Sequence, residues 1–541
     1  MMGIRKIVIF LCLLLVSVNW RVVRSQRVGP VITTKHGSLL GREQFSAGGR
    51  KVFSFRGIRY AESPGGRMFS YTRPATDSWS GTKSAQEPGL PCPQPFMTGQ
   101  YSEDCLHLSV YTPSLSSNRY IPVLIFLTGN LFTFDANGDL NPEDLVAERN
   151  IIVVTVSSRL NAFGFLSFEN VVLPGNTGLL DQFYALIWIK ENIQYFGGDS
   201  SRITLAGSGS GGASALYLAL SPRTSGVAQV MSVSGSPLAS WSRSDNAAEN
   251  ARRFVDRVNC NGPNSRVVLS CLESKNIREI IAGVENHLSN GNMSNIFAPV
   301  IDTFLDSSRQ FVGESINNLE RGRVDKRIRF IIGENEADGT EIMFLLRRNL
   351  ERLNVNDLKY FVENTLIPVS LQKYGNLVFS PFIQQLLSFQ YFPSQVSQGE
   401  NQSKAKTLRE VQTFLTDSNY VAPIRSSLEK LLKSGSEVYS FINTHPIFQL
   451  KTGIRNERSA GAGSFTALLF GEKQFERQTG TRMKRFDKDA SNNVQAALMS
   501  LIEFRSSPPG VRWSYYTQQR HYLEINTLRS ATQYKVRFTK I

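Results

Sequence analysis

The sequence predicts an α/β fold built on a doubly wound, largely parallel sheet. Short apolar and β-branched runs recur at residues 122–127, 151–156, 203–206, 230–233 and 329–332. Runs of this kind are typical of buried strands in a parallel sheet. Helical patterns alternate with them, most clearly at residues 179–195, where an apolar face is followed by Gly197 and Gly198. This alternation predicts a central sheet flanked by helices on both faces.

The 541 residues are predicted to comprise a leader at residues 1–25 and one large domain at residues 26–541. No linker, low-complexity tract or repeat divides the chain, and its hydrophobic content of 41% is ample for one large core. Residues 1–25 have a basic start, an apolar run and a cleavage position after Ser25, as a secretory signal peptide does. The run is shorter than the ~20 residues that a membrane span needs. No later segment is apolar enough to cross a bilayer. We therefore expect a secreted, extracellular protein with no membrane span.

An even number of cysteines remains once Cys12 leaves with the leader, which predicts two disulfides in an oxidising compartment. The local pairing is one of three connectivities that four cysteines allow, and it joins Cys92 to Cys105 and Cys260 to Cys271. Two triplets have the pattern of glycosylation acceptors on secreted proteins, at Asn292 and Asn401.

The formal net charge of +15 favours acidic partners. The densest basic segment, called the basic patch below, consists of Arg477, Arg482, Lys484, Arg485 and Lys488. Outside the cell, the counterparts of such a segment are sulfated polysaccharides or other anionic surfaces. The same residues are compatible with an ordinary solvated loop. We expect no nucleic acid among the partners.

Several motifs carry a family resemblance that spacing alone does not supply. They are Gly57-Ile58-Arg59-Tyr60-Ala61, residues 103–113, Arg159-Leu160, Gly164-Phe165-Leu166-Ser167, residues 174–182 and Phe196-Gly197-Gly198-Asp199. With weaker similarity continuing to the end of the chain, the sequence resembles the type-B carboxylesterase and cholinesterase family. The resemblance implies the α/β-hydrolase fold. The matching stretches themselves are structural, since their glycines permit tight turns and Asp181 is a plausible buried partner of Arg159.

The nucleophile of that family falls on a glycine in this chain. The family motif G-E-S-A-G-G aligns with Gly207-Ser208-Gly209-Ser210-Gly211-Gly212, so that Gly209 stands where the serine belongs. In a G-x-S-x-G elbow, only the middle residue of a strained strand-to-helix turn presents its hydroxyl above the sheet. Ser208 and Ser210 lie one residue to either side, where the turn points them away from a base.

Three further positions of the family's chemistry are altered. The oxyanion segment H-G-G-G-F aligns with residues 128–132, so that Gly129 is kept and side chains replace two glycines at Asn130 and Leu131. Losing even one oxyanion donor typically costs roughly 10²–10³ in rate. The acid of the triad aligns with Asp338, and the histidine aligns with Ala462. We therefore predict no catalytic residue in this chain and interpret Asp338 as a loop-capping residue.

Other chemistries find no support in the sequence. The five histidines, of which His445 is nearest to the altered position, do not group with cysteines or carboxylates as a zinc site requires. The glycine-rich turn lacks the following lysine of a phosphate-binding loop. No metal or cofactor is expected.

Hydrolysis requires a nucleophile, a base and charge stabilisation together. The sequence thus predicts a non-catalytic member of the family, comparable to its neuroligin, neurotactin and glutactin types, acting as a secreted binding or adhesion module. The expected partner is an extracellular protein or an acidic glycan or matrix component. One alternative is a carrier that holds a hydrophobic small molecule in the apolar gorge of the fold. Another is an ester hydrolase that uses Ser208 or Ser210. Residues 490–504 are compatible with a homodimer face or with core.

Overall fold

A computed structural model describes residues 29–96, 99–116, 120–135, 140–288, 296–313, 324–368, 381–392, 404–447, 460–503 and 513–526. The predicted leader and the two predicted glycosylation sites, Asn292 and Asn401, lie outside the described residues.

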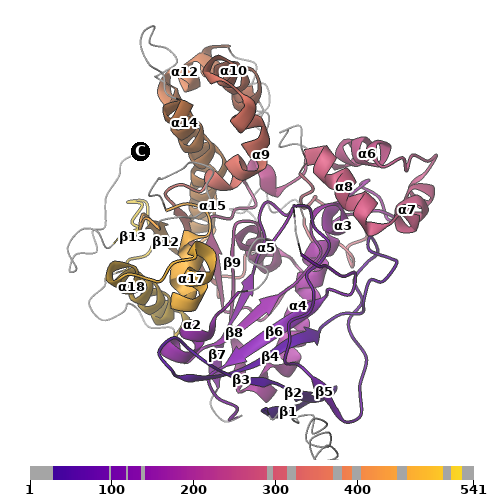
Figure 1. Cartoon of the computed structure of the whole chain (residues 1–541), viewed down its shortest axis with the longest axis vertical. Helices are drawn as coiled ribbons and strands as arrows, with labels where there is room; N and C mark the ends of the chain where they lie inside the picture. Colours follow the sequence, from indigo (N-terminus) through magenta and orange to yellow (C-terminus); the bar gives the residue numbers. More distant parts are fainter. Residues whose placement is uncertain are drawn as a thin grey trace, which may run out of the picture.

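A 10-stranded sheet runs through the centre of the molecule (Figure 1). In spatial order its strands are β13 (Leu523–Ile525), β12 (Glu437–Asn443), β11 (Arg329–Asn335), β10 (Gln229–Val233), β9 (Gly198–Ser208), β7 (Ile121–Leu127), β8 (Ile152–Val156), β6 (His107–Thr112), β4 (Lys51–Arg59) and β3 (Arg42–Phe45). Pairing is parallel from β13 to β8 and antiparallel from β8 to β3. Every predicted strand is present, which confirms the α/β fold with a mostly parallel sheet. A small sheet of β1 (Val31–Thr34), β2 (Gly37–Leu40) and β5 (Thr82–Ser84) lies beside it.

Successive residues of a strand point to opposite faces of the sheet, and β7 shows this clearly. Leu124 and Phe126 belong to one core cluster, and Ile125 and Leu127 belong to the other. The first cluster lies under α2 (Glu143–Arg149), α16 (Ser464–Phe470), α17 (Glu472–Thr479) and α18 (Arg485–Ile502). The second lies under α3 (Asn161–Phe165), α4 (Thr177–Asn192) and α5 (Ser210–Leu220). The helix predicted at residues 179–195 is thus α4 with a 3-10 turn after it.

Residues 490–504 were expected to form either core or a homodimer face. The structure describes them up to residue 503, and most of them lie in α18. Five of its apolar residues are only 0–3% exposed and pack into the core with residues of α16; they are Val494, Ala497, Leu498, Leu501 and Ile502. They are core residues and do not form an exposed dimer face.

Two groups of helices stand beyond the sheet (Figure 1). After β10 come α6 (Ala247–Arg257), α7 (Ser265–Ser274) and α8 (Ile277–Leu288). After β11 come α9 (Thr340–Arg352), α10 (Val355–Phe361), α12 (Pro381–Tyr391), α14 (Lys404–Thr416) and α15 (Ala422–Lys433). Within the described residues, no helix has the length and apolar character that a membrane span would need.

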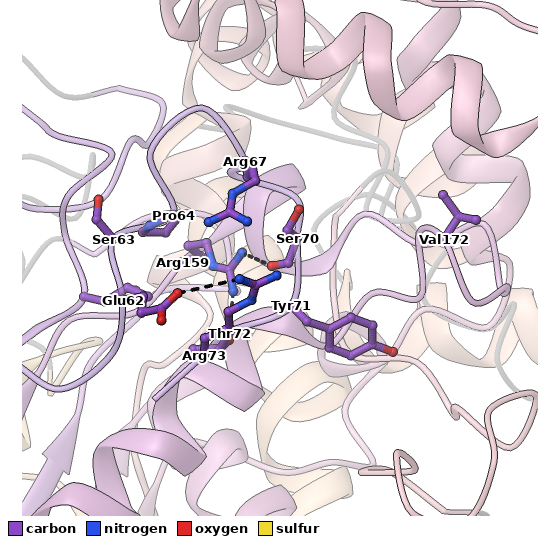
Figure 2. A pocket seen from close by; sticks show the side chains of 11 residues that line it. Glu62, Ser63, Pro64, Arg67, Ser70, Tyr71, Thr72, Arg73, Arg159 and Val172 are labelled. Carbon is purple, nitrogen blue, oxygen red and sulfur yellow. Dashed lines mark hydrogen bonds and ion pairs between the residues drawn. The ribbon is translucent and has the colours of Figure 1, made fainter. Parts of the chain in front are cut away.

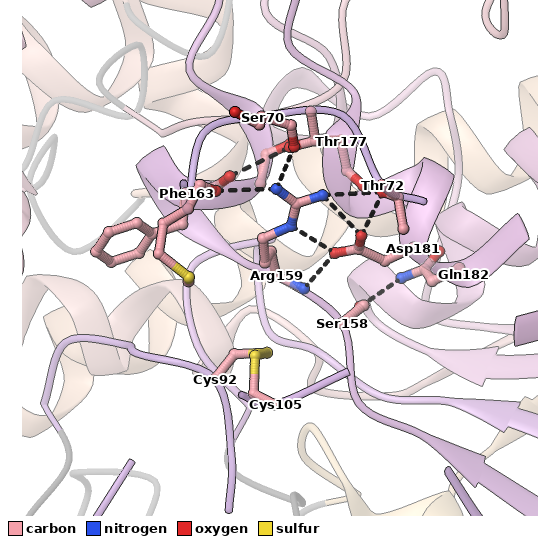
Figure 3. A network of polar contacts seen from close by, with 12 residues as sticks. Ser70, Thr72, Cys92, Cys105, Ser158, Arg159, Phe163, Thr177, Asp181 and Gln182 are labelled. Atoms are coloured by element: carbon pink, nitrogen blue, oxygen red, sulfur yellow. Dashed lines mark hydrogen bonds and ion pairs between the residues drawn. A yellow bond between two sulfur atoms is a disulfide. The ribbon is translucent and has the colours of Figure 1, made fainter. Parts of the chain in front are cut away.

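Covalent and ionic links fix the loops around the sheet. Disulfides join Cys92 to Cys105 and Cys260 to Cys271, the local pairing that the sequence favoured. The predicted pair of Arg159 and Asp181 is also formed (Figure 3). Arg159 Nη2 donates to Asp181 Oδ1 at 2.7 Å, and Arg159 Nε donates to Asp181 Oδ2 at 2.9 Å. Both side chains are buried, so each supplies the counter-charge that the other needs.

Candidate functional site

The turn between β9 and α5 has the shape of a nucleophile elbow. Gly209 separates the strand from the helix with φ 58° and ψ −125°, a conformation that side-chain-bearing residues rarely adopt. The neighbouring glycines are required by close packing, because a Cβ on Gly211 would lie 2.1 Å from the carbonyl oxygen of Leu127. The strained scaffold of the elbow is therefore kept, while its central position carries no side chain.

The space in front of Gly209 is filled by the carboxyl group of Glu341, which lies in the first turn of α9. A Cβ on Gly209 would lie 3.2 Å from Glu341 Oε1 and 3.5 Å from Oε2. Tyr420 donates its hydroxyl hydrogen to Oε2 at 2.8 Å, whereas Oε1 is buried without a partner among the described atoms. Burial is the main cause that raises the pKa of Glu341 to about 8, opposed by hydrogen bonds from Tyr420 and the backbone of Leu131. At neutral pH this carboxyl group is mostly protonated.

The aligned oxyanion turn has an unusual backbone conformation, and the N–H group of Asn130 is already hydrogen-bonded within the turn. Gly129 has φ 150°, and Leu131 has φ 50° although it carries a side chain. The N–H of Asn130 donates to the carbonyl oxygen of Phe134 at 2.7 Å. The backbone of Leu131 faces the carboxyl group of Glu341, as its effect on that pKa indicates. The carboxyl group of Glu341 thus lies beside the turn that aligns with the family's oxyanion segment.

The aligned acid, Asp338, lies buried directly after β11 and is held by an amide. Asn335 donates from its backbone N–H to Asp338 Oδ2 at 2.8 Å and from Nδ2 to Oδ1 at 2.9 Å. Burial raises the pKa of Asp338 to about 6, while hydrogen bonds from Ser234 and Asn335 lower it. The amide oxygen of Asn335 accepts from Asn443 and Ser464, at 2.8 Å and 2.9 Å. Asn335 therefore links the acid to Asn443 of β12 and Ser464 of α16.

The loop aligned with the family's histidine runs next to the acid. Ala337 and Gly461 form a parallel bridge, and the N–H of Ala462 donates to Thr340 Oγ1 at 3.1 Å. The fold thus brings the aligned positions Gly209, Asp338 and Ala462 to one region of the molecule. The side chains differ from those of a catalytic triad, because Ala462 offers no proton acceptor.

The two serines beside the elbow lie at the ends of the strand and the helix that it joins. Ser208 ends β9 and Ser210 begins α5, where it is 2% exposed. A Cβ on Gly129 would lie 2.6 Å from Ser210 Oγ, so this hydroxyl group is packed against the oxyanion turn. Two buried histidines have partners elsewhere: His445 contacts Asp487 at 3.0 Å and His287 contacts Asn250 at 2.7 Å. The described part of the chain contains no group of three or more histidine, cysteine or acidic residues arranged to hold a metal.

The basic patch lies where α17 ends and α18 begins, and all five of its side chains are exposed. Glutamates of α17 partly neutralise it: Glu472 is 2.9 Å from Lys488, and Glu476 is 3.8 Å from Arg482. These two carboxylates precede the basic patch in the sequence, Glu476 by one residue and Glu472 by five, and were not among the charges counted from the sequence. The patch is one exposed surface whose net charge is lower than the sequence suggested.

Sequence reasoning also missed Glu341 and Tyr420. A signal was available for Glu341, since it is an ionisable residue three positions after the aligned acid. No local pattern pointed to Tyr420, which comes from the segment between α14 and α15. Only the fold brings the two together.

A strand-to-helix elbow at the carboxyl end of a central strand of a mostly parallel sheet, with the loops aligned with the acid and the base beside it, defines a hydrolase-type scaffold. A comparison with family models agrees: residues 28–539 match the model described as the carboxylesterase family. The chain belongs to the carboxylesterase family.

Individual relatives include esterases and a neuroligin. The chain is 34% identical over 307 residues to venom carboxylesterase-6 of Apis mellifera, covering 54% of each chain. It is 28% identical over 366 residues to juvenile hormone esterase of Tribolium castaneum, covering 66% of this chain and 57% of that relative. It is 26% identical over 462 residues to neuroligin-2 of Mus musculus, covering 77% of this chain and 53% of that relative. The chain therefore spans little more than half the length of these curated relatives.

Proposed function

We propose that this protein is a secreted, catalytically inactive member of the carboxylesterase family that acts as an extracellular binding or adhesion module. The observation that carries the proposal is the pairing of Gly209 with Glu341. The elbow presents no nucleophile, and a carboxyl group fills the space that a nucleophile and an ester carbonyl would share. Attack on an ester requires a nucleophile, a base and charge stabilisation together. At the aligned positions this chain has Gly209, Ala462 and an oxyanion turn with side chains at Asn130 and Leu131.

Similarity to neuroligin-2 and to insect carboxylesterases supports a role outside the cell. The partner we propose is an acidic glycan or matrix component that contacts the basic patch. Arg482, with a side chain 85% exposed, and Arg485 are both exposed members of the basic patch and lie three positions apart in the sequence. Exposed arginines contribute forked donors that suit sulfate and carboxylate groups.

Inactivity is tested by labelling with a fluorophosphonate probe and by assays with short-chain aryl esters. We expect no labelling at stoichiometric probe and no turnover above buffer. Labelling abolished by Ser208→Ala or Ser210→Ala would contradict the proposal and identify a displaced nucleophile.

Binding is tested on heparin and on extracellular matrix across a salt series. We expect saturable binding that is lost by ~0.3–0.5 M salt, since salt screens exposed charges. The Arg482→Ala, Arg485→Ala double variant should bind at least several-fold more weakly. The control is Arg327→Ala, which removes a side chain 90% exposed outside the patch. If the protein binds neither material and releases a hydrophobic compound on extraction, it is a carrier instead.

A further inference from the structure

We propose that a cleft beside Arg159 is a binding site for an oxyanion, such as a sulfate, phosphate or carboxylate group, held between Arg67 and Arg73. The cleft has a volume of about 240 Å³ and lies between the loop of residues 62–73 and the segment that carries Arg159. Figure 2 shows the guanidinium groups of these three arginines turned toward one another. The cleft is separate from the basic patch and from the elbow, and this inference does not rest on the proposed function.

The loop that carries Arg67 and Arg73 is held by hydrogen bonds from the buried side chain of Arg159. The guanidinium group of Arg159, only 1% exposed, donates to the carbonyl oxygens of Met68 and Ser70 at 2.9 Å and 2.6 Å. The ends of the loop are joined by the N–H of Glu62, which donates to the carbonyl oxygen of Arg73 at 2.9 Å. A ligand would therefore meet a preorganised loop, which lowers the entropic cost of binding.

The accessible cations of the cleft are poorly neutralised. Asp181 compensates the charge of Arg159 through two charged hydrogen bonds (Figure 3). Arg73 is 3.9 Å from Glu62, and with side chains 63% and 41% exposed this pair contributes little. Within the described residues, no carboxylate lies at ion-pair distance from the guanidinium group of Arg67. Glu273 is near enough only for Arg67 to lower its pKa, which burial raises more. Two like charges thus face one concave space, and a bound anion would relieve their repulsion.

The size of the cleft limits the ligand. A volume of about 240 Å³ is below the roughly 300–1,000 Å³ of pockets that take drug-sized ligands. This space holds an inorganic oxyanion or one sugar unit with an anionic group, and it excludes a bulky apolar molecule. Two arginines can each donate a fork of two N–H groups to such an oxyanion.

The test is isothermal titration calorimetry on the full chain at physiological ionic strength, with inorganic sulfate, glucose 6-sulfate and uncharged glucose as probes. We expect saturable binding of the two anionic probes and none of glucose. The Arg67→Ala, Arg73→Ala double variant should bind at least tenfold more weakly, as expected for the loss of a charge-assisted hydrogen bond. Both side chains are exposed, so the variant should fold, which its thermal unfolding would verify.

The controls separate this site from other surfaces. Arg327→Ala and the Arg482→Ala, Arg485→Ala double variant should bind both anionic probes as the wild type does. Tighter binding of glucose 6-sulfate than of sulfate would identify a sugar-borne anion as the ligand, and equal binding would identify the free ion. Absence of saturable binding up to about 10 mM probe would overturn the proposal. So would binding that survives the loss of Arg67 and Arg73, or that disappears with Arg482 and Arg485.

Discussion

Glu341 Oε1 lies 3.2 Å from the position that a Cβ on Gly209 would occupy, so the carboxyl group lies directly against the space that a side chain at position 209 would need. The contact is tighter than most Cβ contacts, and the carbonyl oxygen of Gly129 lies only 3.0 Å away on another side. Glycine is therefore favoured at position 209 for two reasons: the positive φ of its backbone and the space that Glu341 fills. The absence of a side chain at Gly209 and the presence of the glutamate are parts of one arrangement.

Replacing Gly209 by alanine should lower the free energy of unfolding by about 2 kcal/mol, measured by chemical denaturation. Part of this cost is backbone strain, because φ is 58° at this position, and part is the contact with Glu341. The control is Gly49→Ala, where φ is 76° and no atom lies within 4 Å of the added Cβ. The free energy of unfolding of this control should fall only by the cost of backbone strain, about 1 kcal/mol.

A double-mutant cycle between positions 209 and 341 isolates the contact. Gly209→Ala should cost less in a Glu341→Ala background than in the wild type, with a coupling energy on the order of 1 kcal/mol. Purely additive effects would show that Glu341 does not respond to a side chain at position 209.

The stability of the protein should depend on pH through Glu341. Burial raises the pKa of this carboxyl group in the folded state to about 8, from the ordinary value of 4.5 for a glutamate. The folded state then binds the proton more tightly than the unfolded state does. The resulting stabilisation is complete below pH ~4.5 and is lost as the pH rises through about 8. The measurement is the difference in unfolding free energy between wild type and Glu341→Gln from pH 5 to pH 8.5. We expect this difference to shift against the wild type by more than ~1 kcal/mol. Parallel curves for the two proteins would contradict the prediction.

Sequence reasoning predicted the sheet because buried parallel strands leave continuous apolar runs, and β7, β8 and β10 are such runs. It also located the elbow, since the glycines around Gly209 are needed for close packing and stand out in the sequence. The positions aligned with the acid and the histidine, Asp338 and Ala462, lie near each other for the same reason: the scaffold places them.

What the sequence could not show is how groups from distant segments meet. A glutamate in the first turn of a helix is favoured by the helix dipole, so Glu341 resembled an ordinary exposed residue. Its burial depends on the oxyanion turn and Tyr420, both far away in the sequence. The cleft between Arg67 and Arg73 was equally hidden, because it exists only where Arg159 binds the loop that carries them.

Removing one member of the Arg159 and Asp181 pair should destabilise the protein strongly. Asp181→Asn leaves Arg159 buried without its counter-charge, and removing one partner of a buried pair typically costs about 3–5 kcal/mol. The measurement is the midpoint and slope of denaturant unfolding. The matched surface variant is Asp325→Asn, which breaks the exposed pair with Arg327 and should cost about 0–1 kcal/mol. Equal costs for the two variants would show that the buried network adds nothing to the fold.

Rebuilding the aligned triad should fail while Glu341 remains. Gly209→Ser with Ala462→His restores a nucleophile and a base in sequence, and Asp338 remains as the acid. Glu341 still occupies the space before the elbow, and Asn335 still holds both oxygens of Asp338. We expect no fluorophosphonate labelling of this double variant and slow labelling once Glu341→Ala is added, because the backbone of Leu131 then becomes free to face a substrate oxygen. The comparison requires that both variants unfold cooperatively at 25 °C or above. Efficient labelling of the double variant with Glu341 in place would mean that the carboxyl group leaves the elbow readily, and Glu341 would not be what closes this site.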